Sequence, residues 1–391
     1  MSTFGSFFTF VALPVQIYGL TKSSADVGLL GTVQLVPLAV TALWGGAVAD
    51  AMDRRKMLLW CEALLMLGAA AMAINAMLPH PSAGFLFLIA AYMSALSGFH
   101  TPALTALTPK LVTLEDLPAV SGLVSLRNTT ASIAGPALAG ACIAVFGLPS
   151  SYWLNVATFI VSLGAIACIR TMPAPENAAP AGFATIKEGI VYASRRPELI
   201  GTYVVDIVAM TFAMPMAVFP ALAEQWGGAS VVGYLYSAMS AGALIVSIFS
   251  RWTANVNRQG AAVLIAAGLW GVAIVGLGEA HSLWIGILCL ILAGAADMVS
   301  GLFRMTIWNE TIPSTLRGRM AGIEQLSYMT GPLLGNMRAG FMAERFGLGR
   351  SIFWGGLICV AAVVACIPIL PKFWNYRRSE QIVLASGEAE G

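Results

Sequence analysis

Long apolar segments, each close to 20 residues and separated by short polar breaks, recur along the whole chain. A bilayer core roughly 30 Å thick requires about 20 apolar residues from a helix that crosses it. The segments are apolar on every side, whereas a transmembrane strand would alternate polar and apolar residues. With 58% hydrophobic and only 10% charged residues, the chain also lacks the polar surface of a water-soluble fold. We therefore predict an all-α membrane protein with twelve transmembrane helices, at 1–20, 27–49, 56–78, 84–106, 118–146, 150–169, 199–222, 230–250, 260–278, 282–303, 319–343 and 350–371.

The distribution of basic residues indicates the orientation of these spans. An even number of spans places both termini on the same side of the membrane, and fifteen of the 21 Lys and Arg residues fall on that side. Only Lys22, Arg345 and Arg350 fall in breaks on the other side. Because short loops rich in Lys and Arg remain in the cytoplasm, we expect a multi-pass protein of the inner (plasma) membrane with both termini cytoplasmic.

The chain divides into two related halves. A proline followed by a polar break occurs at Pro14 and again at Pro220, and a Gly-Pro pair at 135–136 recurs at 331–332. Two copies of six spans in one orientation are parallel repeats, which in transporters place the substrate site between the halves. We predict four parts: a six-helix bundle at 1–170, a cytoplasmic linker with an amphipathic helix at 171–198, a second six-helix bundle at 199–371 and a cytoplasmic tail at 372–391.

The first span is short beside its repeat. It offers thirteen residues before Pro14, whereas the seventh span offers more than twenty before Pro220. We expect an upstream start that adds a turn or two of helix; the alternative is a first helix that is less tilted than its counterpart.

The break after the second span reads GGAVADAMDRRK, from Gly45 to Lys56. A small residue lets two helices approach closely, a carboxylate can cap a helix N-terminus, and a basic cluster keeps the loop in the cytoplasm. The segment resembles the signature loop of the major facilitator superfamily, although Ala51 and Asp53 depart from its pattern. The resemblance implies that a cytoplasmic gating loop is formed by Gly46, Asp50, Arg54 and Arg55. Asp50→Asn is therefore expected to lower the transport rate with little change in affinity.

A second motif, GPALAG, spans Gly135 to Gly140 in the fifth predicted helix. It resembles the glycine-proline motif of the superfamily's antiporters, which implies a gating role for Gly135, Pro136 and Gly140; a merely packed kink is the competing interpretation. Further stretches, LPVQIYGLTKSSADVGLLG and FPALAEQWGGASVVGYLY, look like the branch that contains enterobactin (siderophore) exporters and multidrug exporters. This resemblance implies efflux of a small, partly apolar molecule by alternating access, in exchange for protons.

Ionisable residues deep in the spans are candidates for the transport pathway, because a charge at the bilayer centre costs about 2.5–3.5 kcal/mol on insertion scales. In the family the first, fourth, seventh and tenth helices line the cavity, which would place Asp206 and Asp297 near the pathway and Arg127 beside it. We take Asp206 as the proton-coupling candidate, Asp297 as its alternative, and Arg127 as the residue that binds substrate or a counter-ion. Structural pairing of Asp206 with Arg127 or Arg304 is the competing explanation.

Three further charges, Glu62, Arg304 and Glu324, lie nearer the cytoplasmic ends and are expected to form interfacial salt bridges. Apolar side chains of the cavity segments would suit bulky cargo, although packing against lipid or another helix is the favoured explanation for any single one. These side chains are Phe7, Phe8, Met210, Phe212, Met214, Met216 and Phe219.

Other function classes receive little support. No GxxxxGK[ST] loop is present, the six cysteines are scattered without a CxxC pair, and the three histidines are far apart. We therefore expect no cofactor, no metal and no catalytic site, and a net charge of +2 does not suggest nucleic-acid binding. The expected partners are a small-molecule substrate, protons and the lipid bilayer, with the protein acting as a monomer. The alternatives are a proton-coupled importer of a metabolite and, more remotely, a membrane enzyme or a receptor-like scaffold.

Overall fold

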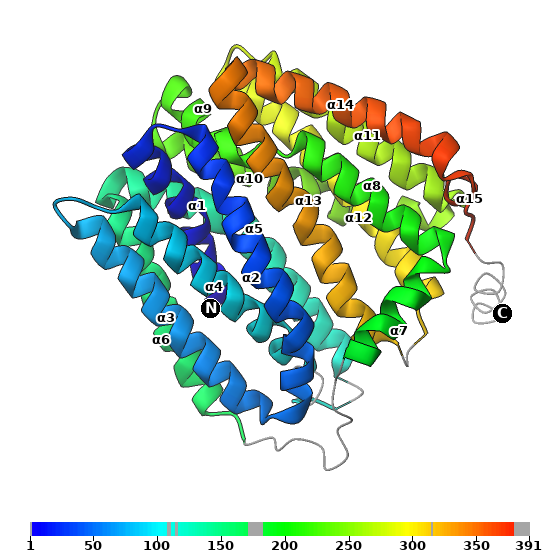
Figure 1. Cartoon of the computed structure of the whole chain (residues 1–391), viewed down its shortest axis with the longest axis horizontal. Helices are drawn as coiled ribbons and strands as arrows, with labels where there is room; N and C mark the ends of the chain where they lie inside the picture. The colour runs from blue at the N-terminus through cyan, green and yellow to red at the C-terminus, as the bar shows by residue number, and fades with distance from the viewer. Residues whose placement is uncertain (1, 108–110, 114–115, 171–182, 314–315, 379–391) are drawn as a thin grey trace.

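The computed structural model describes residues 2–107, 111–113, 116–170, 183–313 and 316–378. Nearly all of these residues are helical, and the described ranges contain no strand. Figure 1 shows long helices in two groups, one built from the first part of the chain (blue to cyan) and one from the later part (green to orange). The predicted all-α fold class is confirmed.

The first group contains six helices that pack on one another. The closest neighbours are α2 with α4, α3 with α6 and α1 with both α5 and α6. Their bounds are α1 Ser2–Thr21, α2 Ser24–Ala51, α3 Arg54–Met77, α4 Ala83–Leu107, α5 Leu117–Phe146 and α6 Leu148–Ala167.

The second group repeats this arrangement after the short helix α7 (Phe183–Ser194). Here α10 packs on α12, and α11 packs on both α12 and α14. The bounds are α8 Pro197–Ala213, η2 Met216–Val218, α9 Phe219–Trp226, α10 Ala229–Ile248, η3 Ser250–Asn255, α11 Gln259–Gly278, α12 Leu283–Thr311, α13 Arg317–Phe346, α14 Leu348–Ile369 and α15 Pro371–Trp374.

Among the described residues, eleven helical segments are long and apolar enough to cross a membrane. Helix α13 has 30 residues, which also suffices for a span, but it carries more charged and polar side chains than the others. With α13 added, the eleven segments make twelve spans, as the predicted twelve-helix arrangement requires. The predicted domain boundaries stay a prediction, because residues 171–182 of the linker lie outside the described residues.

The seventh span differs from its prediction as one continuous helix at 199–222. Helix α8 ends at Ala213, and the chain resumes as η2 and α9. Met214 is extended, with ψ 118°, because it precedes Pro215, and a residue before proline avoids the helical conformation. Helix α1, the counterpart of this span, remains continuous through Pro14.

The two groups meet along two helix pairs, α2 with α13 and α5 with α10. A Cβ at Gly28 would lie 2.6 Å from the Asn336 carbonyl oxygen, and one at Gly140 would lie 2.6 Å from the Cα of Gly233. Glycine is thus required for this backbone approach. Both contacts lie toward the end of the molecule that holds the short loops at 22–23, 147, 227–228 and 347, which we call the closed end. The opposite end, which holds Arg54 and Arg258, we call the basic end.

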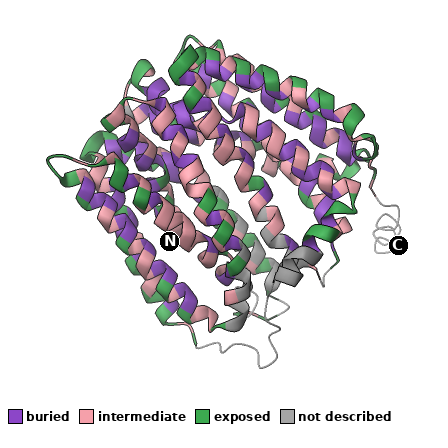
Figure 2. Cartoon of the chain, in the orientation of Figure 1, coloured by how far each residue is buried: buried purple, intermediate pink, exposed green. Residues whose placement is uncertain are grey.

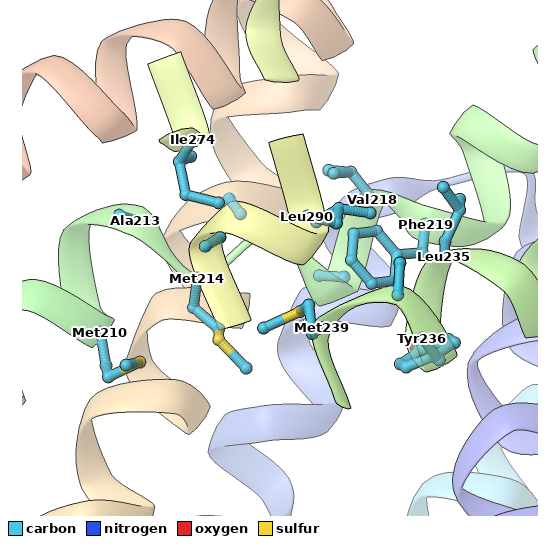
Figure 3. Packing of buried hydrophobic residues seen from close by; sticks show 14 of the residues in the cluster. Met210, Ala213, Met214, Val218, Phe219, Leu235, Tyr236, Met239, Ile274 and Leu290 are labelled. Carbon is cyan, nitrogen blue, oxygen red and sulfur yellow. The ribbon is translucent and has the colours of Figure 1, made fainter. Parts of the chain in front are cut away.

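Buried residues concentrate on the faces that the helices turn toward one another, and exposed residues follow the outer faces (Figure 2). Methionine and aromatic side chains fill part of this core around the break in the seventh span, where Met214 lies beside Met239 (Figure 3) and where Met210, Phe219 and Tyr236 belong to the same buried cluster. Their flexible and flat shapes fill the irregular space that a broken helix leaves. This region of the core therefore supports the cavity described next.

Candidate functional site

A central cavity of about 1020 Å³ lies between the helices. Helices α1, α2, α4 and α5 form most of its wall, and η2, α10 and α13 complete it from the second group. This volume is at the upper limit of ordinary small-molecule sites. The apolar part of the wall includes Phe7, Phe10, Leu30, Met93, Phe159, Met216, Tyr236 and Leu333.

The polar part of the wall is uncharged or basic. Arg127 and His100 are its basic members, and no acidic residue is present among the described residues that line it. Amide side chains add donors and acceptors, from Gln34, Asn128, Asn155 and Asn336. The cavity therefore favours cargo with acidic groups or hydrogen-bond acceptors beside a bulky apolar body.

Arg127 stands on the α5 side of this wall. Its Nε and Nη2 donate hydrogen bonds of 3.2 and 3.0 Å to Oδ1 of the adjacent Asn128, and the side chain is exposed. No ion pair of Arg127 is present among the described residues, so its charge is available to the cavity. Its predicted role in binding substrate or a counter-ion stays a prediction, but its position suits that role.

Asp206 and Asp297 lie elsewhere. The Asp206 Oδ2 atom lies 2.6 Å from Arg304 Nη1, and Asp297 Oδ1 lies 3.7 Å from Arg304 Nη2, so one arginine joins both candidate acids. We call these three residues the arginine triad. Asp206 and Arg304 have side chains only 5% and 10% exposed, and neither acid lines the described cavity wall. Their predicted place near the pathway stays a prediction, and the contacts with Arg304 match the alternative of structural pairing.

The predicted gating loop is mostly helical, since α2 continues to Ala51 and only Met52 and Asp53 separate it from α3. Asp53 caps α3 by accepting hydrogen bonds from the backbone N–H groups of Arg55 and Lys56, at 2.9 and 3.3 Å. Arg55 donates to the carbonyl oxygens of Ile166 and Ala167 at the end of α6. The loop thus ties α3 to α6, and Asp53, which departs from the family pattern, has a structural role.

The side-chain surroundings of two further residues of the predicted loop, Gly46 and Asp50, lie outside the described residues. The gating role of Asp50, Arg54 and Arg55 therefore stays a prediction.

The glycine-proline motif lies on the contact between the two groups. Gly140 packs against Gly233 of α10, and a Cβ at Gly135 would lie 2.7 Å from the Cβ of Phe7. Pro136 lies inside α5 without ending it. The motif therefore occupies a helix pair that has to move if the groups change their relative tilt, which suits its predicted role in gating.

Two ion pairs join residues that the sequence pattern did not connect. Glu62 of α3 pairs with His100 of α4, with 3.1 Å between Oε1 and Nε2. At the closed end, Lys22 Nζ donates to Glu224 Oε1 at 2.7 Å, which joins the two groups and raises the pKa of Lys22 above its ordinary value. Ser23 Oγ also donates to Glu344 across this end, at 2.9 Å.

Salt bridges near the cytoplasmic ends are predicted for Glu62 and Arg304, and each does contact an ionisable side chain. Both side chains, however, are buried in the protein. Of the predicted Met and aromatic residues, Phe7 and Met216 line the cavity. Phe8, Met210, Met214 and Phe219 belong to the buried core instead.

Two packed helical groups around a central cavity, with closely approaching glycines where the groups meet, are typical of membrane transporters built from two repeats. Comparison with known proteins identifies which kind. The model of the family described as transmembrane secretion effector matches residues 1–381, and the chain belongs to this family of the major facilitator superfamily. The predicted superfamily is thereby confirmed, and a transport protein is indicated instead of an enzyme.

Similar proteins support this assignment. Enterobactin exporter EntS of Escherichia coli O6:K15:H31 (strain 536 / UPEC) is 28% identical over 380 residues, covering 96% of this chain and 91% of that protein. The protein of the same name from Shigella dysenteriae serotype 1 (strain Sd197) is 27% identical over 379 residues, with the same coverage of both chains.

Solved structures share the fold at much lower identity. A POT peptide transporter in complex with alafosfalin has a TM-score of 0.73 at 12% identity, covering 97% of this chain and 94% of that one. A bacterial homologue of the iron transporter ferroportin in an inward-facing state has a TM-score of 0.69 at 13% identity, covering 95% and 96%. These likenesses establish the fold alone.

Proposed function

We propose that this chain exports a siderophore, or a molecule of similar chemistry, across the inner membrane in exchange for protons. The observation that carries the proposal is the cavity, which is large and mostly apolar. Its wall contains the basic residue Arg127, and none of the described residues that line it is acidic. The export of a siderophore is also what the name of the relatives records.

The chemistry of a catecholate cargo fits this wall. Aromatic rings pack on phenylalanine and methionine side chains such as Phe10 and Met93. Acidic phenol or carboxylate oxygens accept charge-assisted hydrogen bonds from a guanidinium, which presents a planar set of donors. Arg127 supplies that group, and the side-chain NH2 of Asn336, another residue of the wall, is a further hydrogen-bond donor.

The orientation that the basic residues predict is compatible with export. With both termini in the cytoplasm, the basic end faces the cytoplasm and the closed end faces outward. Ser2, Leu104 and Val120, near the basic-end termini of α1, α4 and α5, all line the cavity. This state therefore suits the loading of cargo from the cytoplasm.

Proton exchange supplies the energy in this proposal. Asp206 is the coupling acid predicted from the sequence, and Asp297 is its alternative. The glycine-proline pair at 135–136 and the gating loop at 46–55 then serve the movement of one group against the other.

The test uses inside-out membrane vesicles that contain the full chain, with enterobactin as the probe and an acidic lumen, which is the physiological direction of the proton gradient in this orientation. Accumulation of the probe inside these vesicles supports export. Accumulation only in right-side-out vesicles would instead establish import.

Replacing Arg127 tests the cavity itself. Arg127→Gln should weaken the apparent affinity for enterobactin about 10- to 100-fold, because a hydrogen bond to a charged group contributes about 1.5–3 kcal/mol. Arg127→Lys keeps the charge without the planar donors and should lose less. Equal affinities in wild type and both variants would exclude Arg127 from the cargo site.

A further inference from the structure

A buried carboxylate lies directly behind the cavity wall. Glu62 of α3 is 2% exposed, and its Oε1 accepts a 2.8 Å hydrogen bond from Ser2 Oγ and lies 3.1 Å from His100 Nε2. Its other oxygen, Oε2, is buried and has no hydrogen-bond partner among the described residues. The two groups that cover Oε1, Ser2 and His100, are themselves part of the cavity wall.

The surroundings of Glu62 come from four helices. His100 of α4 is the ionisable group that faces it, and Cys61 is its neighbour on α3. Helices α1 and α6 present the hydroxyl groups of Ser2 and Ser162, whose oxygens are 3.4 Å apart. Within the described part of the chain, no lysine or arginine forms an ion pair with Glu62.

His100 is placed to connect this acid with the cavity. Its side chain is 18% exposed and lines the cavity while one ring nitrogen contacts Glu62. A buried carboxylate is stable as an anion only while hydrogen bonds or a cation compensate its charge. Movement of α1 would take Ser2 away from Oε1, and movement of α4 would take His100 away. Binding of a proton would then neutralise the negative charge that has lost its partner.

We propose that Glu62 and His100 together form the proton-binding site of the transport cycle. The second ring nitrogen of His100 takes a proton from water in the cavity, and the Nε2 proton passes to Glu62 Oε1. The products are a neutral imidazole and a carboxylic acid, and release follows the reverse path. The proposal rests on the proton exchange of the proposed function and assigns the coupling acid to α3.

Infrared titration of the purified full chain in nanodiscs tests proton binding without any cargo. The wild type should show a pH-dependent C=O band of protonated carboxylic acids. One component of this band comes from Glu62 and should be absent in Glu62→Gln. His100→Gln, which keeps a hydrogen-bonding side chain but cannot titrate, should retain that component and move its pH midpoint. Asp206→Asn, the matched control in the arginine triad, should leave it unchanged. A band that Glu62→Gln leaves intact, or that Asp206→Asn removes, would overturn the assignment.

Transport then separates this proposal from the proposed function. In proteoliposomes with enterobactin as the probe, Glu62→Gln should reduce accumulation driven by a pH gradient to simple equilibration, and movement down the cargo's own gradient should persist. If the wild type responds to the pH gradient and Glu62→Gln responds equally, the present proposal fails. If the wild type itself ignores the pH gradient, proton exchange fails, and the infrared titration still decides whether the pair binds a proton.

Discussion

The two halves of the molecule each bury an acid, but they compensate it differently. In the second half, Asp206 lies 2.6 Å from the guanidinium of Arg304, which also reaches Asp297. In the first half, Glu62 has a histidine and a serine hydroxyl as partners and keeps one oxygen without a partner among the described residues. Both acids are nearly inaccessible, so burial alone does not distinguish them.

The difference lies in the partner. An arginine keeps its charge at any physiological pH, so it favours the ionised form of a neighbouring carboxylate. An imidazole can accept and donate a proton through its two ring nitrogens, and this one also lines the cavity. The comparison suggests that the arginine triad holds the second helix group together, while the Glu62–His100 pair is able to exchange protons with the pathway.

Replacing Arg304 should cause the largest loss of stability against unfolding. Arg304→Gln leaves Asp206 buried without its cation, and breaking a buried pair in this way costs about 3–5 kcal/mol. Thermal unfolding of the detergent-solubilised variant should show a clear loss of stability. The control is Arg251→Gln, which removes an exposed arginine of η3 and should behave like wild type. A stable Arg304→Gln protein would show that the triad does not hold the group together.

Neutralising Asp206 should cause a smaller loss of stability against unfolding. Asp206→Asn keeps the shape of the side chain and leaves Arg304 its contact with Asp297, so we expect a loss of about 1.5–3 kcal/mol, the contribution of a hydrogen bond to a charged group. Unfolding and pH-driven transport measured on the same preparation decide the outcome. Unchanged stability with complete loss of proton coupling would reverse the comparison and support Asp206 as the coupling acid.

The exposed pair at the closed end should matter least for stability. Lys22→Gln removes an ion pair between solvent-exposed side chains, and such pairs contribute little. Its effect should instead appear as easier separation of the two groups at this end, measured by spin-label distances between α1 and α9.

The pH dependence of this contact follows from the pKa of Lys22. Because the hydrogen bond to Glu224 raises this pKa from its ordinary value of 10.5, the contribution of the contact is complete below that value as long as Glu224 stays ionised. The contribution disappears only as the pH rises through the raised pKa. Weakening of the contact near neutral pH would contradict this assignment.

Much of the architecture was accessible from the amino-acid sequence, because the length of an apolar run is a local property that the bilayer thickness translates directly into a helix. The spans predicted at 260–278 and 350–371 correspond to α11 (Gln259–Gly278) and α14 (Leu348–Ile369) within two residues. The Gly-Pro pairs indicated the repeat, since two related halves place the same backbone requirement at matching positions. The basic residues likewise predicted an orientation without any knowledge of packing.

Only the tertiary structure decided which side chains meet. Glu62 and His100 are 38 residues apart and lie on different helices, and the rotation of each helix about its own axis determines whether they face one another. The same holds for Asp206 and Arg304, and for which methionines face the cavity and which enter the core. In a helix that is apolar on every side, the sequence carries little information about that rotation, because lipid and protein interior accept the same side chains. Contacts between helices, such as the close approach of the glycine-lined pairs, fix these rotations, and such contacts form only in the folded protein.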